Sequence, residues 1–236
     1  ENNPLSYKKY KVISTVFAEF NLYRNLVFKS QFSVDFSHVT GFSQSFPSYL
    51  PNQGEGSASR NTSDGLNLQV TNTLTYRFDI DNTHDFNFLL GHEGQNYHSE
   101  TFGVVTKGQT NDLLTDVQQG TRAIGWNSTA AADYSRMSFF GRAEYNYTDR
   151  YYADFSVRTD GSSRFGKDNR WGAFWSLGAM WNLRNEAFMS HTRNWLTFAQ
   201  ISLSTGTSGN SEIPHYEHLA LVGGGLVSIG ISGMVP

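Results

Sequence analysis

Apolar and polar residues alternate with a period of two along much of the chain. In residues 66–80 one face is apolar except at Asn72, and the opposite face is polar throughout. Residues 26–37, 135–148 and 151–160 repeat the pattern with few exceptions. Such alternation predicts β-strands with one apolar and one wet face, because successive side chains point to opposite sides of a strand. Helical spacing explains none of these stretches.

Eight strands are predicted, and several are longer than the strands of soluble domains. Their approximate ranges are 9–22, 26–38, 66–80, 84–100, 134–148, 151–160, 170–183 and 195–205. Strands of soluble domains usually run about five or six residues, whereas a strand that crosses a membrane needs roughly 9–11. Strand length therefore favours an all-β membrane protein, an antiparallel meander of about eight long strands, over an ordinary sandwich.

The links between these strands alternate between short and long. Very short links hold Arg24-Asn25, Asp81-Asn82 and Asp149-Arg150. The long links are residues 39–65, 101–133, 161–169 and the region from 206 onward; the link 184–194 is intermediate and predicts one helical turn at 185–189. Outer-membrane barrels sort their connections in this way, with short periplasmic turns and longer outer loops.

Aromatic residues gather near the ends of the predicted strands. Tyr145, Tyr147, Tyr151 and Tyr152 flank the turn at Asp149, and strand 170–183 carries Trp171, Trp175 and Trp181. Tyr and Trp favour the membrane interface, where barrels carry aromatic girdles. Aromatic residues also favour strands in general, so packing within a sandwich or a hairpin is the alternative.

Composition narrows the class of protein. Among 236 residues, charged side chains make up 17% and aromatic ones 15%, which is unlike a disordered chain or a coiled coil. The net charge of −3 and the absence of a basic stripe argue against a nucleic-acid partner. Cysteine is absent, which excludes disulfides and thiolate metal sites.

The two ends of the sequence carry weaker signals. The start has no Met, basic region or apolar stretch of a signal peptide, so we expect a mature product or a fragment. The uncharged run 219–236 has nearly the length of a membrane helix. Its five glycines and final Pro favour a Gly-rich loop and strand instead.

One stretch resembles a known family. The run Asp160-Gly161-Ser162-Ser163-Arg164-Phe165-Gly166, followed by Asn169-Arg170-Trp171-Gly172, is similar to a highly specific signature of the SusC/RagA family of TonB-dependent outer-membrane transporters of Bacteroidetes. Residues 138–151 precede the signature in the same way, and residues 71–76, 89–93 and 203–210 resemble further family segments. The similarity spans roughly residues 66–220.

The resemblance implies part of a plugged, 22-stranded transmembrane β-barrel in the cell outer membrane. It implies nutrient uptake, of a glycan or a peptide, with a SusD-like surface lipoprotein as lid and the TonB complex as energy source, and neither an enzyme nor a cofactor. We find no match to the family's plug domain or TonB box, and the last barrel strands are not represented. Residues 1–236 are therefore expected to be the middle part of the barrel.

Two sets of candidate residues follow. The first is the signature itself, in which Gly161 and Gly166 are expected to relax a turn at the end of a strand. A charge network is predicted among Arg158, Asp160, Arg164, Asp168 and Arg170. A structural role as a loop brace is favoured over substrate binding, because paired charges usually serve structure.

The second set is predicted to line the lumen, because its members alternate with the apolar face. It comprises Lys29, Gln31, Asp35, Gln69, Arg77, Arg136, Arg142 and Glu144. The substrate-binding residues cannot be assigned from the sequence. The assigned faces predict that Phe32→Arg impairs assembly, whereas Gln31→Arg is tolerated.

Other functions stay open at this point. A soluble carbohydrate-binding β-sandwich requires a closed apolar core, and a complete eight-stranded barrel requires strand 9–22 to pair with strand 195–205. A separate piece of barrel would leave two sheet edges unpaired. His92-Glu93 with His98 lacks metalloprotease spacing and makes only a weak metal site. Residues 215–218, with two His and one Glu, are expected in a solvated loop.

Overall fold

Antiparallel strands dominate the computed structural model of the chain, which describes residues 4–49, 54–128, 132–165, 170–192, 194–209, 223–226 and 232–235. Side chains are described in all of these except residues 125–128 and the last two ranges. The strands are Leu5–Tyr23 (β1), Leu26–Ser45 (β2), Gly56–Ile80 (β3), His84–Gln109 (β4), Arg122–Ser128 (β5), Ala132–Tyr147 (β6), Tyr151–Ser162 (β7), Trp171–Asn182 (β8), Gln200–Gly206 (β9), Gly223–Leu226 (β10) and Ser232–Val235 (β11). No helix in the described part of the chain is long and apolar enough to cross a membrane.

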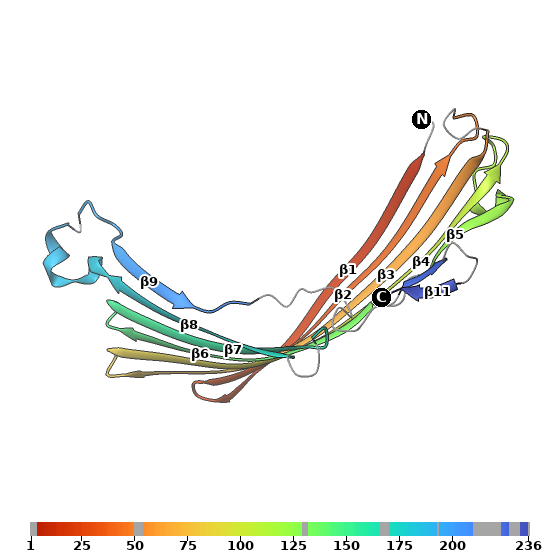
Figure 1. Ribbon diagram of the computed structural model, residues 1–236. Coiled ribbons are helices and arrows are strands. Elements are labelled where there is room, and N and C mark those ends of the chain that lie inside the picture. The colour runs from red at the N-terminus through yellow and green to blue at the C-terminus, as the bar shows by residue number, and fades with distance from the viewer. Residues whose placement is uncertain are drawn as a thin grey trace. The chain divides into compact units, whose positions relative to one another are not determined.

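The strands follow one another as a meander in the order β1-β2-β3-β4-β6-β7-β8-β9 (Figure 1), and β5 pairs with β4 outside this path. The chain divides into two compact units. Unit 1 comprises residues 1–15, 33–69 and 96–133, and unit 2 comprises residues 16–32, 70–95 and 134–236. Strands β1 to β4 each contribute residues to both units.

Two short turns of unit 2 have the geometry that tight hairpins require. Asp81 and Asn82 have φ of 55° and 49°, and Thr83 N–H donates to the Ile80 carbonyl at 3.1 Å. Paired positive φ values are typical of a type I′ turn, whose twist matches the twist of the flanking strands. The short link predicted at residues 81–82 is therefore confirmed.

The next short turn is shifted by one residue from its predicted place. Thr148 and Asp149 have φ of 50° and 56°, and Arg150 N–H donates to the Tyr147 carbonyl at 2.9 Å. Asn146 Oδ1 accepts from the backbone N–H of Asp149 at 3.0 Å. This bond fixes the turn one residue earlier than Asp149-Arg150.

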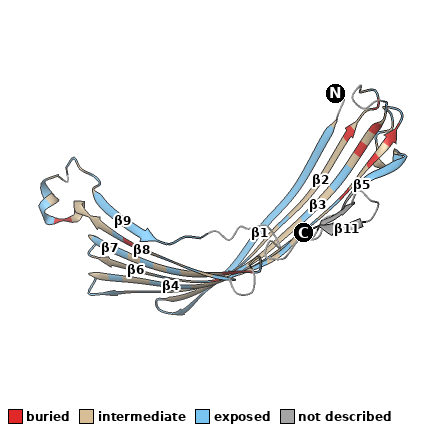
Figure 2. Cartoon of the chain, in the orientation of Figure 1, coloured by how far each residue is buried: buried red, intermediate tan, exposed pale blue. Residues whose placement is uncertain are grey.

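Strand register in unit 2 separates the two faces of the sheet. Glu144 on β6 lies opposite Asp154 on β7, which lies opposite Gly178 on β8. The alternate positions place Ala143, Phe155 and Leu177 in line on the other face. Figure 2 shows the resulting alternation of exposed and half-buried residues along β7 and β8.

The sheet has almost no buried apolar core. Ala58 is the one hydrophobic residue that is buried among those whose side chains the structure describes. Large apolar side chains such as Phe155, Trp175 and Leu177 are instead 44–49% exposed although strands flank them on both sides. This arrangement contradicts the soluble sandwich, which needs a closed apolar core.

The order of strands also contradicts the complete eight-stranded barrel. That alternative requires β1 to pair with β9, but these two strands end the strand order and no pairing joins them in the described part of the chain. Both strands are exposed along their whole length, as edge strands are (Figure 2).

In unit 1 the strands run further than predicted. β2 continues to Ser45, β3 starts at Gly56 and β4 continues to Gln109, so the expected links 39–65 and 101–133 are largely strand. Polar side chains rather than apolar alternation stabilise these extensions, as in the 2.6 Å hydroxyl contact between Ser43 and Ser59. In these extensions apolar and polar residues do not alternate regularly, and the strand prediction depended on that alternation.

Strand β5 was also missed, and the segment before it folds back on the sheet. Thr106 Oγ1 donates to the Val117 carbonyl at 2.8 Å, and Gln44 Nε2 donates to the Leu114 carbonyl at 3.1 Å. Asp116 caps a short 3-10 helix, Val117–Gln119 (η2). Buried residues are found at this end of β2, β3 and β4 (Figure 2).

The last part of the chain contains the predicted types of element, but they begin and end at other residues than predicted. The helical turn expected at 185–189 is present as two 3-10 helices, Leu183–Asn185 (η4) and Ala187–Thr192 (η5), and β9 begins at Gln200 instead of residue 195. Within the run 219–236, β10 pairs with β11. The Gly-rich strand interpretation therefore holds for those described residues.

Candidate functional site

The candidate site is the face of unit 2 that carries the charged residues, here called the polar face. It is built by the side chains of Arg77, Asn87, Arg142, Glu144, Asp154, Ser156, Arg158 and their neighbours at alternate positions. The opposite face carries the alternate apolar residues and is called the apolar face. A pocket on unit 2 is lined by residues of β3, β4, β6, β7, β8 and β9.

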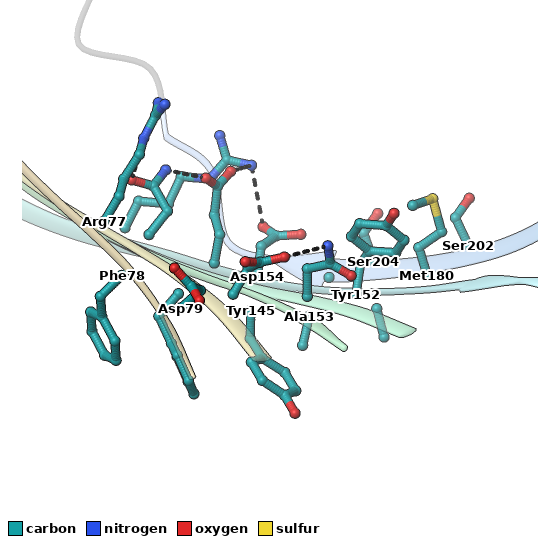
Figure 3. Close-up of a pocket in the computed structure, with 18 of the residues that line it drawn as sticks. Arg77, Phe78, Asp79, Tyr145, Tyr152, Ala153, Asp154, Met180, Ser202 and Ser204 are labelled. Atoms are coloured by element: carbon teal, nitrogen blue, oxygen red, sulfur yellow. Dashed lines mark hydrogen bonds and ion pairs between the residues drawn. The ribbon is translucent and has the colours of Figure 1, made fainter. Parts of the chain in front are cut away.

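A row of polar contacts crosses the polar face from β3 to β7. Arg77 Nε donates to Asn87 Oδ1 at 3.2 Å, and Asn87 Nδ2 donates to Glu144 Oε2 at 2.5 Å. Arg142 Nη2 lies 2.9 Å from Glu144 Oε1 and 3.9 Å from Asp154 Oδ2. Figure 3 shows Arg77 and Asp154 on one side of the sheet and the rings of Phe78 and Tyr145 on the other.

The position of Arg142 has an electrostatic reason. Glu144 and Asp154 are directly opposite each other on β6 and β7, and two like charges in such a pair repel. The guanidinium of Arg142 contacts both carboxylates and offsets the repulsion. Gly178 follows on β8, where a Cβ atom would collide with the Asp154 carboxylate, so glycine leaves room for this acidic side chain.

A second cluster surrounds Arg158 farther along β7. Its guanidinium lies 2.6 Å from Asp160 and 3.2 Å from Glu93, and it donates to Ser138 Oγ at 3.0 Å. Its charge also lies 5.4 Å from the centre of the Phe140 ring. Five donors in a rigid fork allow one guanidinium to hold three strands, β4, β6 and β7, in register.

The signature turn is held by its own backbone and by β6. Ser163 N–H donates to the Ser135 carbonyl at 3.0 Å, and Ser135 N–H donates to Ser163 Oγ at 2.9 Å. Ser162 N–H donates to the Arg170 carbonyl at 3.1 Å, and Phe165 N–H donates to the Ser162 carbonyl at 3.3 Å. These contacts support the loop-brace interpretation of Ser162, Ser163 and Phe165.

Within the predicted charge network, Arg158 pairs with Asp160, and Arg164 stacks 4.0 Å above the ring of Tyr134. Arg170 is exposed. Gly166, Asp168 and Asn169 lie outside the described residues, so their part in the network stays a prediction.

The expected reason for Gly161 was wrong. Gly161 lies within β7, and it is not among the described residues with positive φ, so it relaxes no turn. A Cβ atom here would lie 2.9 Å from the Trp171 indole, which is directly opposite on β8. Glycine therefore makes room for Trp171. Gly172 has the same function toward Phe174, whose ring would lie 3.0 Å from an added Cβ.

The remaining residues that were predicted to line the lumen occupy separate places. Lys29 lies 4.6 Å above the Phe17 ring, and Asp35 pairs with Lys11 at 3.0 Å. Arg136 lies opposite Ser162 on β7. Gln31 and Gln69 lie on β2 and β3. That these residues face a lumen stays a prediction.

Sequence reasoning missed several members of the site. Asn87, Glu93 and Asp154 complete both clusters, but they were not among the residues predicted to line the lumen. Asn87 and Glu93 lie an even number of positions apart on β4 and therefore share one face of that strand. Extending the period-two pattern across the turn at 81–82 would have found them.

The apolar face of β7 and β8 has the dimensions of a membrane band. Tyr151 lies opposite Trp181 at one end, and Gly161 lies opposite Trp171 at the other, ten residues along each strand. Ten residues span about 33 Å along a strand. A tilt of about 35–45° reduces this length to a height of about 23–27 Å, which matches the roughly 25 Å apolar band of outer-membrane barrels.

Aromatic rings are concentrated at the short-turn end of this face. Tyr147, Tyr151 and Trp181 are neighbours, with ring centroids 6.2 Å apart for each consecutive pair. Phe86 connects Tyr145 and Phe78 at 5.0 and 4.9 Å. This row of rings across β3, β4, β6, β7 and β8 fits an interfacial girdle better than isolated hairpin pairs.

The described histidines do not gather into a metal site. No group of three or more His, Cys, Asp or Glu that could hold a metal ion is found in the described part of the chain. The ring of His92 lies 5.1 Å from that of Phe139, and His98 pairs with Asp133 at 2.6 Å. Residues 215–218 lie outside the described ranges.

Comparisons with known proteins agree with this geometry. No protein-family model matches the chain. The TonB-dependent receptor P26 of Formosa agariphila is 33% identical over 204 residues, which are 83% of this chain and 20% of the relative. The TonB-dependent receptor SusC of Bacteroides thetaiotaomicron is 35% identical over 129 residues, 55% of this chain and 12% of the relative.

Solved structures give the same picture. The RagAB peptide transporter matches 99% of this chain and 26% of its own chain, with 33% identity and a TM-score of 0.84. The ferric preacinetobactin receptor BauA of Acinetobacter baumannii, at 11% identity and a TM-score of 0.51, shows the fold alone. The parts that match this chain thus make up only 12–26% of the length of these three relatives, which are 33–35% identical to it.

The two faces, the girdle and these matches define the class: the chain carries the sheet of an outer-membrane β-barrel. Within that class it is SusC/RagA-like and shares the fold of the TonB-dependent transporters. Its named relatives are receptors and transporters, which agrees with the expectation of a protein that is not an enzyme.

Proposed function

We propose that the chain forms part of the barrel wall of a TonB-dependent nutrient importer, with its apolar face in lipid and its polar face toward the lumen. The observation that carries this proposal is the joint placement of the girdle and the charged rows on opposite faces of the same strands. A porin-like wall requires the same division, because lipid excludes charge and the transported solute is polar. The relatives supply the importer class.

The wider assembly belongs to the same proposal. The complete polypeptide would add a plug domain and further strands to make a 22-stranded barrel. A SusD-like lipoprotein would cover the outer opening, and the TonB complex would supply energy. The cargo would be a glycan or a peptide. The similarity to SusC and to RagAB supports these parts of the proposal.

The test compares uptake with and without the complete polypeptide. A strain lacking its gene should lose uptake of at least one fluorescent oligosaccharide or peptide from a mixed panel, and a protonophore should abolish the same uptake in the parent strain. Unchanged uptake of every panel member, or uptake that resists the protonophore, would contradict the proposal.

A matched pair of variants tests the assigned faces in the same assay. Ser204 on β9 lies opposite Gly178 on the polar face, whereas the neighbouring Leu203 lies opposite Ala179 on the apolar face and is 77% exposed. Ser204→Trp should reduce uptake at equal amounts of protein in the outer membrane, because it adds bulk toward the lumen. Leu203→Trp should leave uptake unchanged. The reverse order would refute the assigned faces.

A further inference from the structure

The described part of the segment between β8 and β9, residues 183–192 and 194–199, is attached to the short-turn end of unit 2. Its two 3-10 helices, η4 and η5, follow β8 directly (Figure 1). Asn185 Nδ2 donates to the Asp149 carbonyl in the turn between β6 and β7 at 2.8 Å. Arg184 closes the segment on itself, with Nε donating to the Leu196 carbonyl at 3.3 Å. The segment is therefore fixed to the strand ends.

Glu186 holds this segment against the apolar face. Its Oε1 accepts from the Tyr151 hydroxyl at 2.7 Å and from Trp181 Nε1 at 3.0 Å, and Arg150 lies 4.0 Å from Oε2. These donors lower the pKa of Glu186, with the Tyr151 hydroxyl as the largest cause. Both aromatic donors belong to the girdle. The buried Glu186 carboxylate therefore attaches the segment to the row of rings expected at the membrane interface.

The segment then presents three large apolar side chains that no element in the described part of the chain covers. Phe188, Trp195 and Phe198 are 62%, 72% and 67% exposed. The Phe188 ring meets that of Trp181 edge-on, with centroids 6.4 Å apart, and so continues the girdle beyond the end of β8. In water these surfaces would be unfavourable, whereas the headgroup region of a bilayer accommodates amphipathic rings.

We propose that residues 183–192 and 194–199 form a lateral anchor that inserts Phe188, Trp195 and Phe198 into the lipid interface at the short-turn side of the membrane. The partner is the bilayer itself, because the exposed Phe188 ring is continuous with the girdle at Trp181, and Trp195 and Phe198 lie in the same exposed segment. Exposed Ser190 and Asn194 interrupt the apolar residues, so the segment lies at the surface of the leaflet and does not cross it. Lipid contact then extends beyond the strands to a connecting segment.

Spin labels test this proposal in the complete polypeptide reconstituted in phosphatidylethanolamine–phosphatidylglycerol vesicles. The chain has no cysteine, so single labels can be placed at Phe188→Cys, Trp195→Cys and Phe198→Cys, with Ser190→Cys as the matched control from the same segment. The ratio of collisions with oxygen to collisions with a water-soluble nickel chelate should be several-fold higher at the three aromatic positions. Equal ratios at all four positions would overturn the proposal.

Substitution of Glu186 gives a second test of the proposal. Glu186→Ala should lower the oxygen preference of a label at Phe188 toward that of Ser190, because the segment loses its attachment to Tyr151 and Trp181. Glu186→Gln keeps an acceptor for both donors and should retain the preference. No difference between these two variants would refute the role of Glu186 as the attachment point.

If a label prevents folding, fluorescence of the unlabelled protein gives an independent result. Lipids brominated close to the headgroup should quench the wild type more than Trp195→Phe, which lacks the interfacial indole. Equal quenching of the two proteins would show that Trp195 is not in contact with lipid.

Discussion

The neighbouring residues Gln31 and Phe32 offer a direct test of which face of the sheet is in lipid. Both lie on β2 in unit 2, and they point to opposite sides of the strand. Phe32 is 42% exposed although β1 and β3 flank its strand. Phe32→Arg would place a guanidinium in the apolar band, whereas Gln31→Arg would add the same group to the wet face.

The expected cost follows from the depth of Phe32. Phe32 is six positions along β2 from Leu26, the first residue of that strand after the short turn. These positions span about 20 Å along the strand and about 14–16 Å of height at a tilt of about 35–45°. This position is near the middle of a band about 25 Å tall, where an arginine costs about 2–4 kcal/mol. The ratio of folded to unfolded protein should fall roughly 30- to 700-fold.

The assay is refolding of the complete polypeptide from urea into phospholipid vesicles, with the folded fraction followed by heat-modifiable migration on gels. Gln31→Arg should stay within about 0.5 kcal/mol of the wild type, as surface substitutions do. Phe32→Arg should shift the urea midpoint strongly or prevent insertion. Equal midpoints, or greater damage from Gln31→Arg, would refute the assignment of the faces.

Three further predictions concern stability, each measured by urea unfolding of the complete polypeptide. Gly161→Ala should lower the free energy of unfolding by about 1–3 kcal/mol, because the added Cβ meets the Trp171 ring. Gly94→Ala is the control, since an added Cβ there has no neighbour closer than 4.0 Å. Equal losses of stability in the two variants would show that the Trp171 contact is not the cause. Arg158→Met should lower the free energy of unfolding by about 1 kcal/mol, because the ion pairs of Arg158 are partly exposed to solvent. Unchanged stability would show that this cluster does not brace the strands. The pKa of Glu186 is lowered in the folded state, so its contribution is present above the ordinary carboxyl pKa and is lost as pH falls through the folded value. The midpoints of wild type and Glu186→Gln should therefore converge in acid, and a constant difference would contradict the lowered pKa.

The parts of the fold that depend on alternation could be predicted from the sequence. The ranges 151–160 and 170–183 lie within one or two residues of β7 and β8, because apolar residues occupy nearly every second position there. The extensions of β2, β3 and β4 in unit 1 could not be predicted, since polar residues occupy both of their faces. Strand β5 was not predicted, because its pairing with β4 depends on a bulge at Val105/Thr106 that the sequence does not reveal.

The candidate site shows the same division. Arg77, Arg142 and Glu144 were found because each alternates with apolar neighbours on its own strand. Alternation could also have placed Asn87 and Asp154 on the wet face, but their contacts with Arg77, Arg142 and Glu144 depend on the register between strands, which the sequence does not reveal. Glu186 lies in a 3-10 connection with no periodic pattern, so only the structure reveals its contacts with Tyr151 and Trp181.

We expect β7 to cross the outer membrane with its odd-numbered residues in lipid and its even-numbered residues toward the lumen. Single cysteines at each position from 152 to 159, in the complete polypeptide in native membranes, can be tested for their rate of reaction with a water-soluble maleimide. Reaction should be fast at even positions such as Asp154 and Ser156, and odd positions such as Phe155 and Val157 should be protected. Similar rates along the whole strand, or protection of the even positions, would contradict it.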